Sequence, residues 1–162
     1  MKKLISCRHG DFNFDPTTGE YRINRDGRTQ IERLAQAIKR RIGDSSTTLI
    51  SSKAPRAIDS AEIIRDYLGL PKFEVIAYLW AANDTPKDIY HYWKDRDLTK
   101  LANLIEPRSD SDCLIVVSHH GPAEDIVREV KRLNGIAGKI RELDYGGAAC
   151  LDLELKEYML LQ

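Results

Sequence analysis

The chain has 162 residues, a length that predicts one compact domain spanning residues 1–162 with a core that needs no disulfides or metal. Lys plus Arg and Asp plus Glu both number 25, so the formal net charge is zero. Phosphate neutralisation requires an excess of cations, so this balance argues against a nucleic-acid partner bound by whole-domain charge. A local basic pocket remains compatible with it.

The cysteines and the apolar runs indicate where in the cell the protein is expected. Three cysteines (Cys7, Cys113 and Cys150) cannot all pair, and reduced thiols in a cytoplasmic protein are the better interpretation. The apolar stretch at residues 4–7 is too short for a signal peptide, and no run approaches the ~18 apolar residues of a membrane span. We therefore expect a cytoplasmic protein without a membrane partner.

In chain order, apolar runs bounded by turn residues alternate with amphipathic stretches. We expect strands at 4–7, 48–51, 73–77 and 113–117, a polar loop at 11–26, helices at 27–42, 55–68, 85–105 and 122–133, and a closing hairpin over 148–161. Pro55 opens its helix and Gly69 ends it. Strand–helix alternation over the whole length predicts an α/β layered domain.

Polar side chains follow three of these strands. Arg8 and His9 come after the first, Arg56 opens the helix after the second, and His119 and His120 come after the fourth. Ligand groups gather where strands end and helices begin, and a helix N-terminus favours anions. The planar guanidinium of arginine binds two oxygens at once. The pattern therefore predicts a phosphate pocket; Arg8-His9-Gly10 alone is a weak signal, and its joint occurrence with the others strengthens it.

These segments resemble the histidine phosphatase superfamily. The resemblance is carried by Arg8-His9-Gly10, by residues 51–61 (SSKAPRAIDSA) and by residues 116–119 (VVSH), and it extends from residue 3 to about 150. It implies a three-layer α/β/α sandwich around a mainly parallel central sheet, the phosphoglycerate-mutase-like fold. The small size and lack of inserted lobes look most like the short bacterial phosphohistidine phosphatases.

The resemblance also implies roles. His9 would be the nucleophile that forms a phosphohistidine, while Arg8, Arg56 and His119 would hold the phosphoryl oxygens, so no metal or other cofactor is implied. The family places its histidine directly after Ser or Thr, which selects His119 and leaves His120 exposed. In the loop at 11–26, Asn13 is a candidate substrate-binding residue.

The chain departs from the pattern at the proton donor. Where the mutase-like branch has a Glu after the third strand, this sequence reads Leu79-Trp80-Ala81, and Asp84 and Asp11 are the remaining candidates. A leaving group of low pKa needs less acid help, which favours phosphohistidine over alkyl phosphates as substrate. The alternatives are a broad phosphomonoesterase acting on small phosphorylated metabolites and a non-catalytic phosphate-binding module. The expected partner is accordingly a phosphorylated protein or a small-molecule phosphate.

Overall fold

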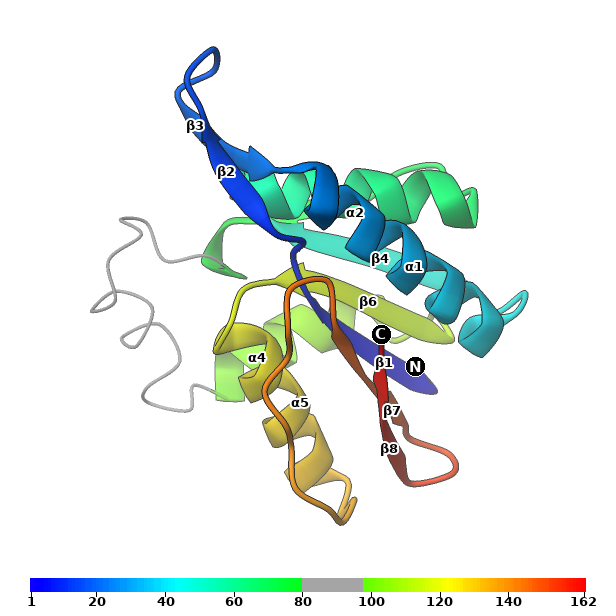
Figure 1. The fold of residues 1–162 in the computed structure, drawn as a ribbon. Coiled ribbons are helices and arrows are strands. Elements are labelled where there is room, and N and C mark those ends of the chain that lie inside the picture. Colours follow the sequence, from blue (N-terminus) through cyan, green and yellow to red (C-terminus); the bar gives the residue numbers. More distant parts are fainter. Residues whose placement is uncertain (80–97) are drawn as a thin grey trace.

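The computed structural model describes residues 1–79 and 98–162, and it contains a twisted central sheet with helices on both faces (Figure 1). In chain order the elements are β1 (Lys3–Arg8), β2 (Phe12–Asp15), β3 (Glu20–Ile23), α1 (Arg25–Ile42), β4 (Thr47–Ser52), α2 (Pro55–Leu68), β5 (Glu74–Ile76), η1 (Ala77–Leu79), α4 (Leu98–Ile105), η2 (Glu106–Arg108), β6 (Cys113–Ser118), α5 (Pro122–Leu133), β7 (Ala148–Asp152) and β8 (Glu157–Leu161).

The main sheet has the strand order β5-β4-β6-β1-β7-β8. The β5–β4, β4–β6 and β6–β1 pairs are parallel, whereas β7 is antiparallel to both β1 and β8. The sheet is therefore mixed and mainly parallel, and the hairpin expected at the end of the chain is confirmed as β7 and β8. Strand β6 is buried at every position, which accounts for its unbroken apolar sequence.

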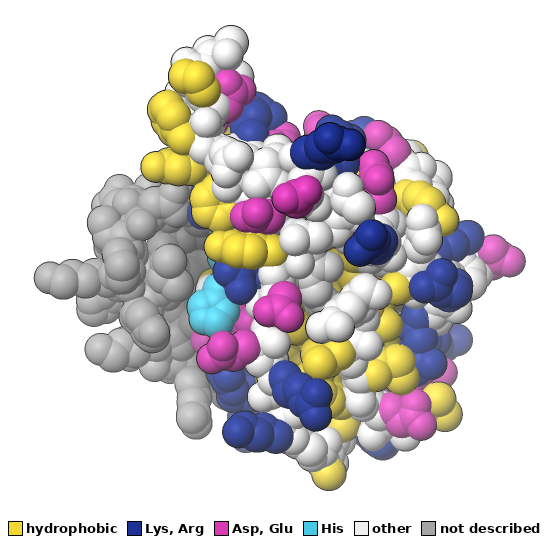
Figure 2. Space-filling view, in the orientation of Figure 1, with side chains coloured by type: hydrophobic (Ala, Val, Ile, Leu, Met, Phe, Trp, Pro, Cys, Tyr) yellow, Lys and Arg dark blue, Asp and Glu magenta, His cyan; other side chains and the backbone are white. Residues whose placement is uncertain are grey.

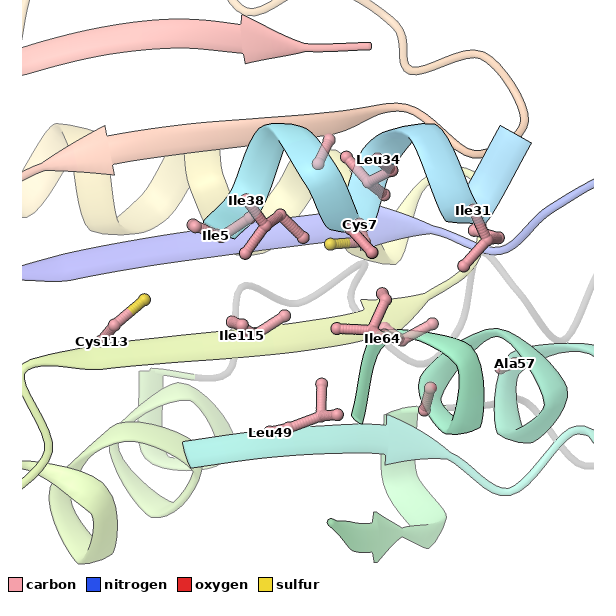
Figure 3. Close-up of a cluster of buried hydrophobic side chains, with 14 of the residues drawn as sticks. Ile5, Cys7, Ile31, Leu34, Ile38, Leu49, Ala57, Ile64, Cys113 and Ile115 are labelled. Carbon is pink, nitrogen blue, oxygen red and sulfur yellow. The ribbon is translucent and has the colours of Figure 1, made fainter. Parts of the chain in front are cut away.

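Two hydrophobic clusters fill the space on the two faces of the sheet. On one face, Ile5 and Ile115 pack with residues of α1 and α2, such as Leu34 and Ile64 (Figure 3). The neighbouring strand residues point the other way, and they pack with residues of α4 and α5. This alternation builds the three α/β/α layers and confirms the expected fold class.

Local signals set the helix ends. The Asn24 side chain caps α1 by accepting a hydrogen bond from the Gly27 N–H (2.8 Å), so this helix begins two residues before the predicted start. Helix α2 spans Pro55–Leu68 as predicted, and Gly69, with φ of 69°, closes it in the left-handed conformation.

The predicted polar loop at 11–26 is an antiparallel hairpin of β2 and β3 that projects from the body of the protein (Figure 1). Pro16 and Gly19 interrupt regular structure only at the turn between the two strands. The expected helix at 85–105 is seen as α4 over Leu98–Ile105, and its first part lies outside the described residues. In the described ranges, no helix is long and apolar enough to cross a membrane.

Candidate active site

The segments that follow β1, β4 and β6 bring together His9, Arg56 and His119, three of the side chains that the sequence places at strand ends. Strand β1 lies beside β6, and the His9 N–H donates to the Ser118 carbonyl (3.0 Å). The His9 and His119 rings are 5.0 Å apart between centroids, and Arg56 Nε lies 3.2 Å from His9 Nε2. His9, Arg56 and His119 are 3%, 7% and 6% exposed, respectively. The result is a nearly buried cluster of imidazoles and guanidinium groups.

Hydrogen bonds define the tautomer of His9. Its Nδ1 lies 2.8 Å from the Gly10 carbonyl oxygen, which can only accept, so Nδ1 carries the proton. Its Nε2 accepts from the Arg56 guanidinium, which can only donate. The ring is therefore neutral, with the lone pair on Nε2 beside Arg56. A nucleophilic histidine needs this state.

His119 is held neutral by its surroundings. Burial is the largest cause that keeps the pKa of His119 well below its ordinary value. The adjacent His9 and the positive charges of Arg56 and Arg8 lower it further. The Nε2 atom lies 2.8 Å from Ser52 Oγ at the end of β4. Ser52 lies within the motif at residues 51–61, and its contact with His119 was not predicted.

The next residue, His120, lies outside the cluster. Its side chain is 56% exposed, and Nδ1 lies 3.3 Å from Glu124 Oε1. The placement agrees with the expectation that His119 lies in the pocket and His120 at the surface. Figure 2 shows basic and acidic side chains interspersed over the face it presents, in keeping with the zero net charge.

A loop before β7 holds Arg8. Arg8 Nη1 donates to the Leu143 carbonyl (2.8 Å), and its guanidinium carbon lies 3.9 Å from the centroid of the Tyr145 ring. The backbone of the same loop bonds to β1, since the Gly146 N–H donates to the His9 carbonyl (3.0 Å). Gly146 has φ of 68°, a conformation that favours glycine. Sequence reasoning missed this loop, and the Tyr-Gly-Gly run before β7 was the signal for it.

Asn13 is not brought to His9. On β2, Phe12 faces the site with its ring 5.2 Å from that of His9, and neighbouring strand residues point to opposite sides. Asn13 instead lines a cavity of about 530 Å³ between the β2–β3 hairpin and α2, where Arg22 bonds Asp59 (2.6 Å). Its proposed contact with substrate stays a prediction that the geometry does not favour.

Of the two candidate proton donors, Asp11 lies in the part of the chain that the structure describes. The Asp11 carboxylate accepts hydrogen bonds on both oxygens, from the Phe12 N–H (2.8 Å) and the Asn24 amide (3.1 Å). Asp84 lies outside the described residues. Among the residues described, no group of three or more His, Cys, Asp or Glu side chains is arranged to hold a metal ion.

Comparisons with known proteins agree with the motifs. The histidine phosphatase superfamily (branch 1) matches residues 4–77, which include Arg8, His9 and Arg56. A comparison with curated protein sequences finds no match.

Several solved structures share the fold. A phosphohistidine phosphatase SixA from Agrobacterium tumefaciens superposes with a TM-score of 0.69 at 14% identity, covering 99% of this chain and 96% of that one. A protein histidine phosphatase SixA complexed with tungstate gives 0.64 at 20% identity, with 98% and 93% covered. A mycobacterial glucosyl-3-phosphoglycerate phosphatase gives 0.66 at 16% identity, with 98% and 96% covered. The family model thus matches the part of the chain that carries Arg8, His9 and Arg56, and the solved structures share the phosphoglycerate-mutase-like fold, so the chain is similar to the histidine phosphatase superfamily in these motifs and in its fold.

Proposed function

We propose that the chain is a phosphohistidine phosphatase that works without a metal, through a covalent phosphohistidine on His9. The observation that carries this proposal is the position of His9 Nε2, which lies 3.2 Å from Arg56 Nε in a nearly buried cluster with His119. A lone pair beside fixed positive charge is what in-line attack on a phosphoryl group requires.

In the first step, His9 Nε2 attacks phosphorus, the P–Nε2 bond forms and the bond to the leaving group breaks. The ring gains positive charge as it does so, and the Nδ1–H stays bonded to the Gly10 carbonyl, which stabilises that charge. The leaving group departs with the electron pair of its bond to phosphorus and takes up a proton. In the second step water attacks phosphorus, the P–Nε2 bond breaks, and orthophosphate and neutral His9 are released.

The remaining cluster residues stabilise the phosphoryl oxygens. Arg8 and Arg56 supply two fixed positive charges, and His119, kept neutral by the depression of its pKa, supplies a hydrogen-bond donor. Such preorganised donors act on the charge spread over the equatorial oxygens in the transition state. These groups provide the stabilisation that metal ions provide in other phosphatases.

We favour phosphohistidine over alkyl phosphate as the substrate because of the groups available as general acid for the leaving group. The sequence lacks the Glu of the mutase-like branch, and the Asp11 carboxylate is engaged as a hydrogen-bond acceptor. A weak general acid favours substrates whose leaving group departs readily. The likeness to two proteins named as SixA supports the same choice, whereas the likeness to a metabolite phosphatase keeps a small phosphorylated metabolite as the alternative.

The test is phosphate release, in EDTA, from p-nitrophenyl phosphate and from a phosphohistidine-bearing protein. We expect His9→Ala to lose activity by on the order of 10⁴-fold. The control is Tyr67→Ala, which removes an exposed side chain of α2 outside the cluster and should leave the rate near that of wild type. An unchanged His9→Ala variant would overturn the proposal.

Reactions quenched rapidly in acid or in base test for the covalent phosphoenzyme. A phosphoenzyme stable in base and labile in acid, absent from His9→Ala, is expected to form and decay at the rate of turnover. A phosphohistidine that forms and never hydrolyses would instead identify a phosphate-binding module. The ratio of rates on the two substrates decides between protein and metabolite phosphates.

A further inference from the structure

A buried carboxylate outside the catalytic cluster connects two parts of it. Glu124, in the first turn of α5, is 4% exposed. Its Oε2 accepts from the Gly121 N–H (2.7 Å) and its Oε1 from the Leu143 N–H (3.0 Å). Burial of a carboxylate is costly unless hydrogen bonds compensate for the lost water. These two bonds provide that compensation, and they join two segments that are distant in sequence.

The bond from Gly121 is a common helix cap, whereas the bond from Leu143 is not part of the cap. A Glu at the third helical position often accepts from the backbone N–H of the residue that precedes the helix, as Glu124 does from Gly121. A cap needs nothing more. The second oxygen reaches Leu143, nineteen positions along the chain, in the loop before β7.

Leu143 is the residue whose carbonyl accepts from Arg8 Nη1 at 2.8 Å. Glu124 therefore holds Leu143 by its N–H, and Leu143 holds Arg8 by its carbonyl. At the other oxygen, Gly121 belongs to the turn that follows His119, where the Ala123 N–H donates to the His119 carbonyl (3.0 Å). A single carboxylate thus ties the loop that orients Arg8 to the turn that carries His119.

The anchor is itself fixed to the sheet. Ser6 Oγ, buried on β1, donates to the Ala123 carbonyl (2.9 Å), which pins the first turn of α5 to the strand that ends in Arg8. Glu124 is therefore presented from a rigid element, and the loop before β7 is what it positions. Supports of this kind hold a binding group within the narrow tolerance that catalysis needs.

We propose that Glu124 is a positioning residue for Arg8, acting through Leu143 to set where the guanidinium meets the phosphoryl group. This inference rests on the proposed function for its kinetic consequence, although its effect on anion binding does not depend on turnover. Glu124 does not touch the reacting atoms in this scheme.

Two substitutions weaken the link between the turn and the loop. Glu124→Gln keeps the shape but has a single acceptor oxygen for two N–H donors. Glu124→Asp keeps the charge but is shorter by one methylene, so its carboxylate cannot bond Gly121 and Leu143 together as that of Glu124 does. We expect both to lower kcat/KM by about 10- to 100-fold, because a shift of about 1 Å in a binding group costs up to 10²-fold.

The matched control is Asp152→Asn. Asp152 is also a buried carboxylate with a backbone partner, the Leu155 N–H at 3.1 Å, and it pairs with Arg41 at the other end of β7. Its loss should lower the melting temperature and leave kcat/KM within about twofold of wild type, as for a distant independent site. Equal kinetic losses in Asp152→Asn and Glu124→Gln would overturn the proposal.

A double-mutant cycle with Arg8→Lys tests whether Glu124 acts through Arg8. If Glu124 acts through Arg8, Glu124→Asp should cost much less in the Arg8→Lys background than in wild type. Fully multiplicative losses would show that Glu124 acts elsewhere.

Titration of the same variants with inorganic phosphate and with tungstate, followed by calorimetry, needs no turnover. We expect their Kd values to rise about tenfold in Glu124→Asp and not in Asp152→Asn. Unchanged anion affinity in Glu124→Asp would refute the positioning role. Weakened affinity in a protein whose activity does not depend on His9 would instead refute the proposed function alone.

Discussion

Helix α1 packs closely against the loop after His9 at Gly27, and Gly27→Ala tests what this packing contributes. A Cβ at residue 27 would lie 2.0 Å from the Asp11 carbonyl oxygen and 2.7 Å from its nitrogen. Carbon and carbonyl oxygen ordinarily approach to about 3.3–3.6 Å, so helix α1 and the loop after β1 must separate by more than about 1 Å. Both atoms belong to backbone, which cannot turn away as a flexible side chain can.

The magnitude follows from two opposing effects. Gly→Ala inside a helix gains about 1 kcal/mol of intrinsic helix stability. Overpacking costs about 1–3 kcal/mol, and backbone against backbone belongs at the upper end. We expect Gly27→Ala to lower the free energy of unfolding by about 2 kcal/mol, or the melting temperature by about 4–8 °C for a chain of this size.

Activity should fall as well, because Asp11 is two residues from His9 and a shift of about 1 Å costs up to 10²-fold. Thermal unfolding and kcat/KM are measured together. The control is Gly19→Ala at the hairpin turn, where φ is 71° and no atom lies within 4 Å of the added Cβ. It should lose about 1 kcal/mol of stability through backbone strain and keep its activity. A melting temperature of Gly27→Ala at or above that of wild type would refute this reasoning.

Two further predictions concern titratable groups. Because the pKa of His119 is lowered in the folded protein, the unfolded chain binds its proton first as the pH falls below about 6.5, and stability should decrease there by up to about 1.4 kcal/mol per pH unit. Urea unfolding in phosphate-free buffer between pH 7 and 5 should show this slope, and His119→Gln should flatten it; an equally steep variant contradicts the assignment. Burial raises the pKa of the Cys7 thiol, raises that of Cys113 to about 12 and raises that of Cys150, so none should react with a disulfide reagent until denaturant is added. Rapid reaction of Cys7 in the native protein would show that the burial of β1 has been overestimated.

The parts of the fold that could be predicted from the sequence are those with local signals. Pro55 and Gly69 mark both ends of α2, and the unbroken apolar run marks β6. The convergence of Arg8, His9 and His119 also follows from local information, because the carboxyl ends of adjacent parallel strands share one edge of a sheet. Sequence order and strand ends were therefore enough to bring these side chains together, whereas the role of His9 as candidate nucleophile came from the resemblance to a known family.

What escaped prediction depends on long-range hydrogen bonds. Leu143 lies 135 positions from Arg8, and it contributes a backbone carbonyl, which no residue type reveals. Ser52 likewise acquires its partner only when β4 and β6 pair. Asn13 is different, because the alternation of Phe12 and Phe14 around it signals a strand and predicts that Asn13 points away from His9.

The electrostatics of the site explain how a chain with no net charge gathers a local cluster suited to anions. Acidic and basic side chains balance over the whole molecule, but the fold places the buried Arg56 against His9 and His119, with the partly exposed Arg8 at the end of the neighbouring strand. Burial, together with His9, Arg56 and Arg8, lowers the pKa of His119, so added positive charge is unfavourable there. A bound phosphoryl group reverses that balance, so the arrangement that destabilises the empty protein favours the occupied one. Anion binding should therefore stabilise the fold by RT ln(1 + [L]/Kd), and the strength of that coupling measures how far the site is preorganised for charge.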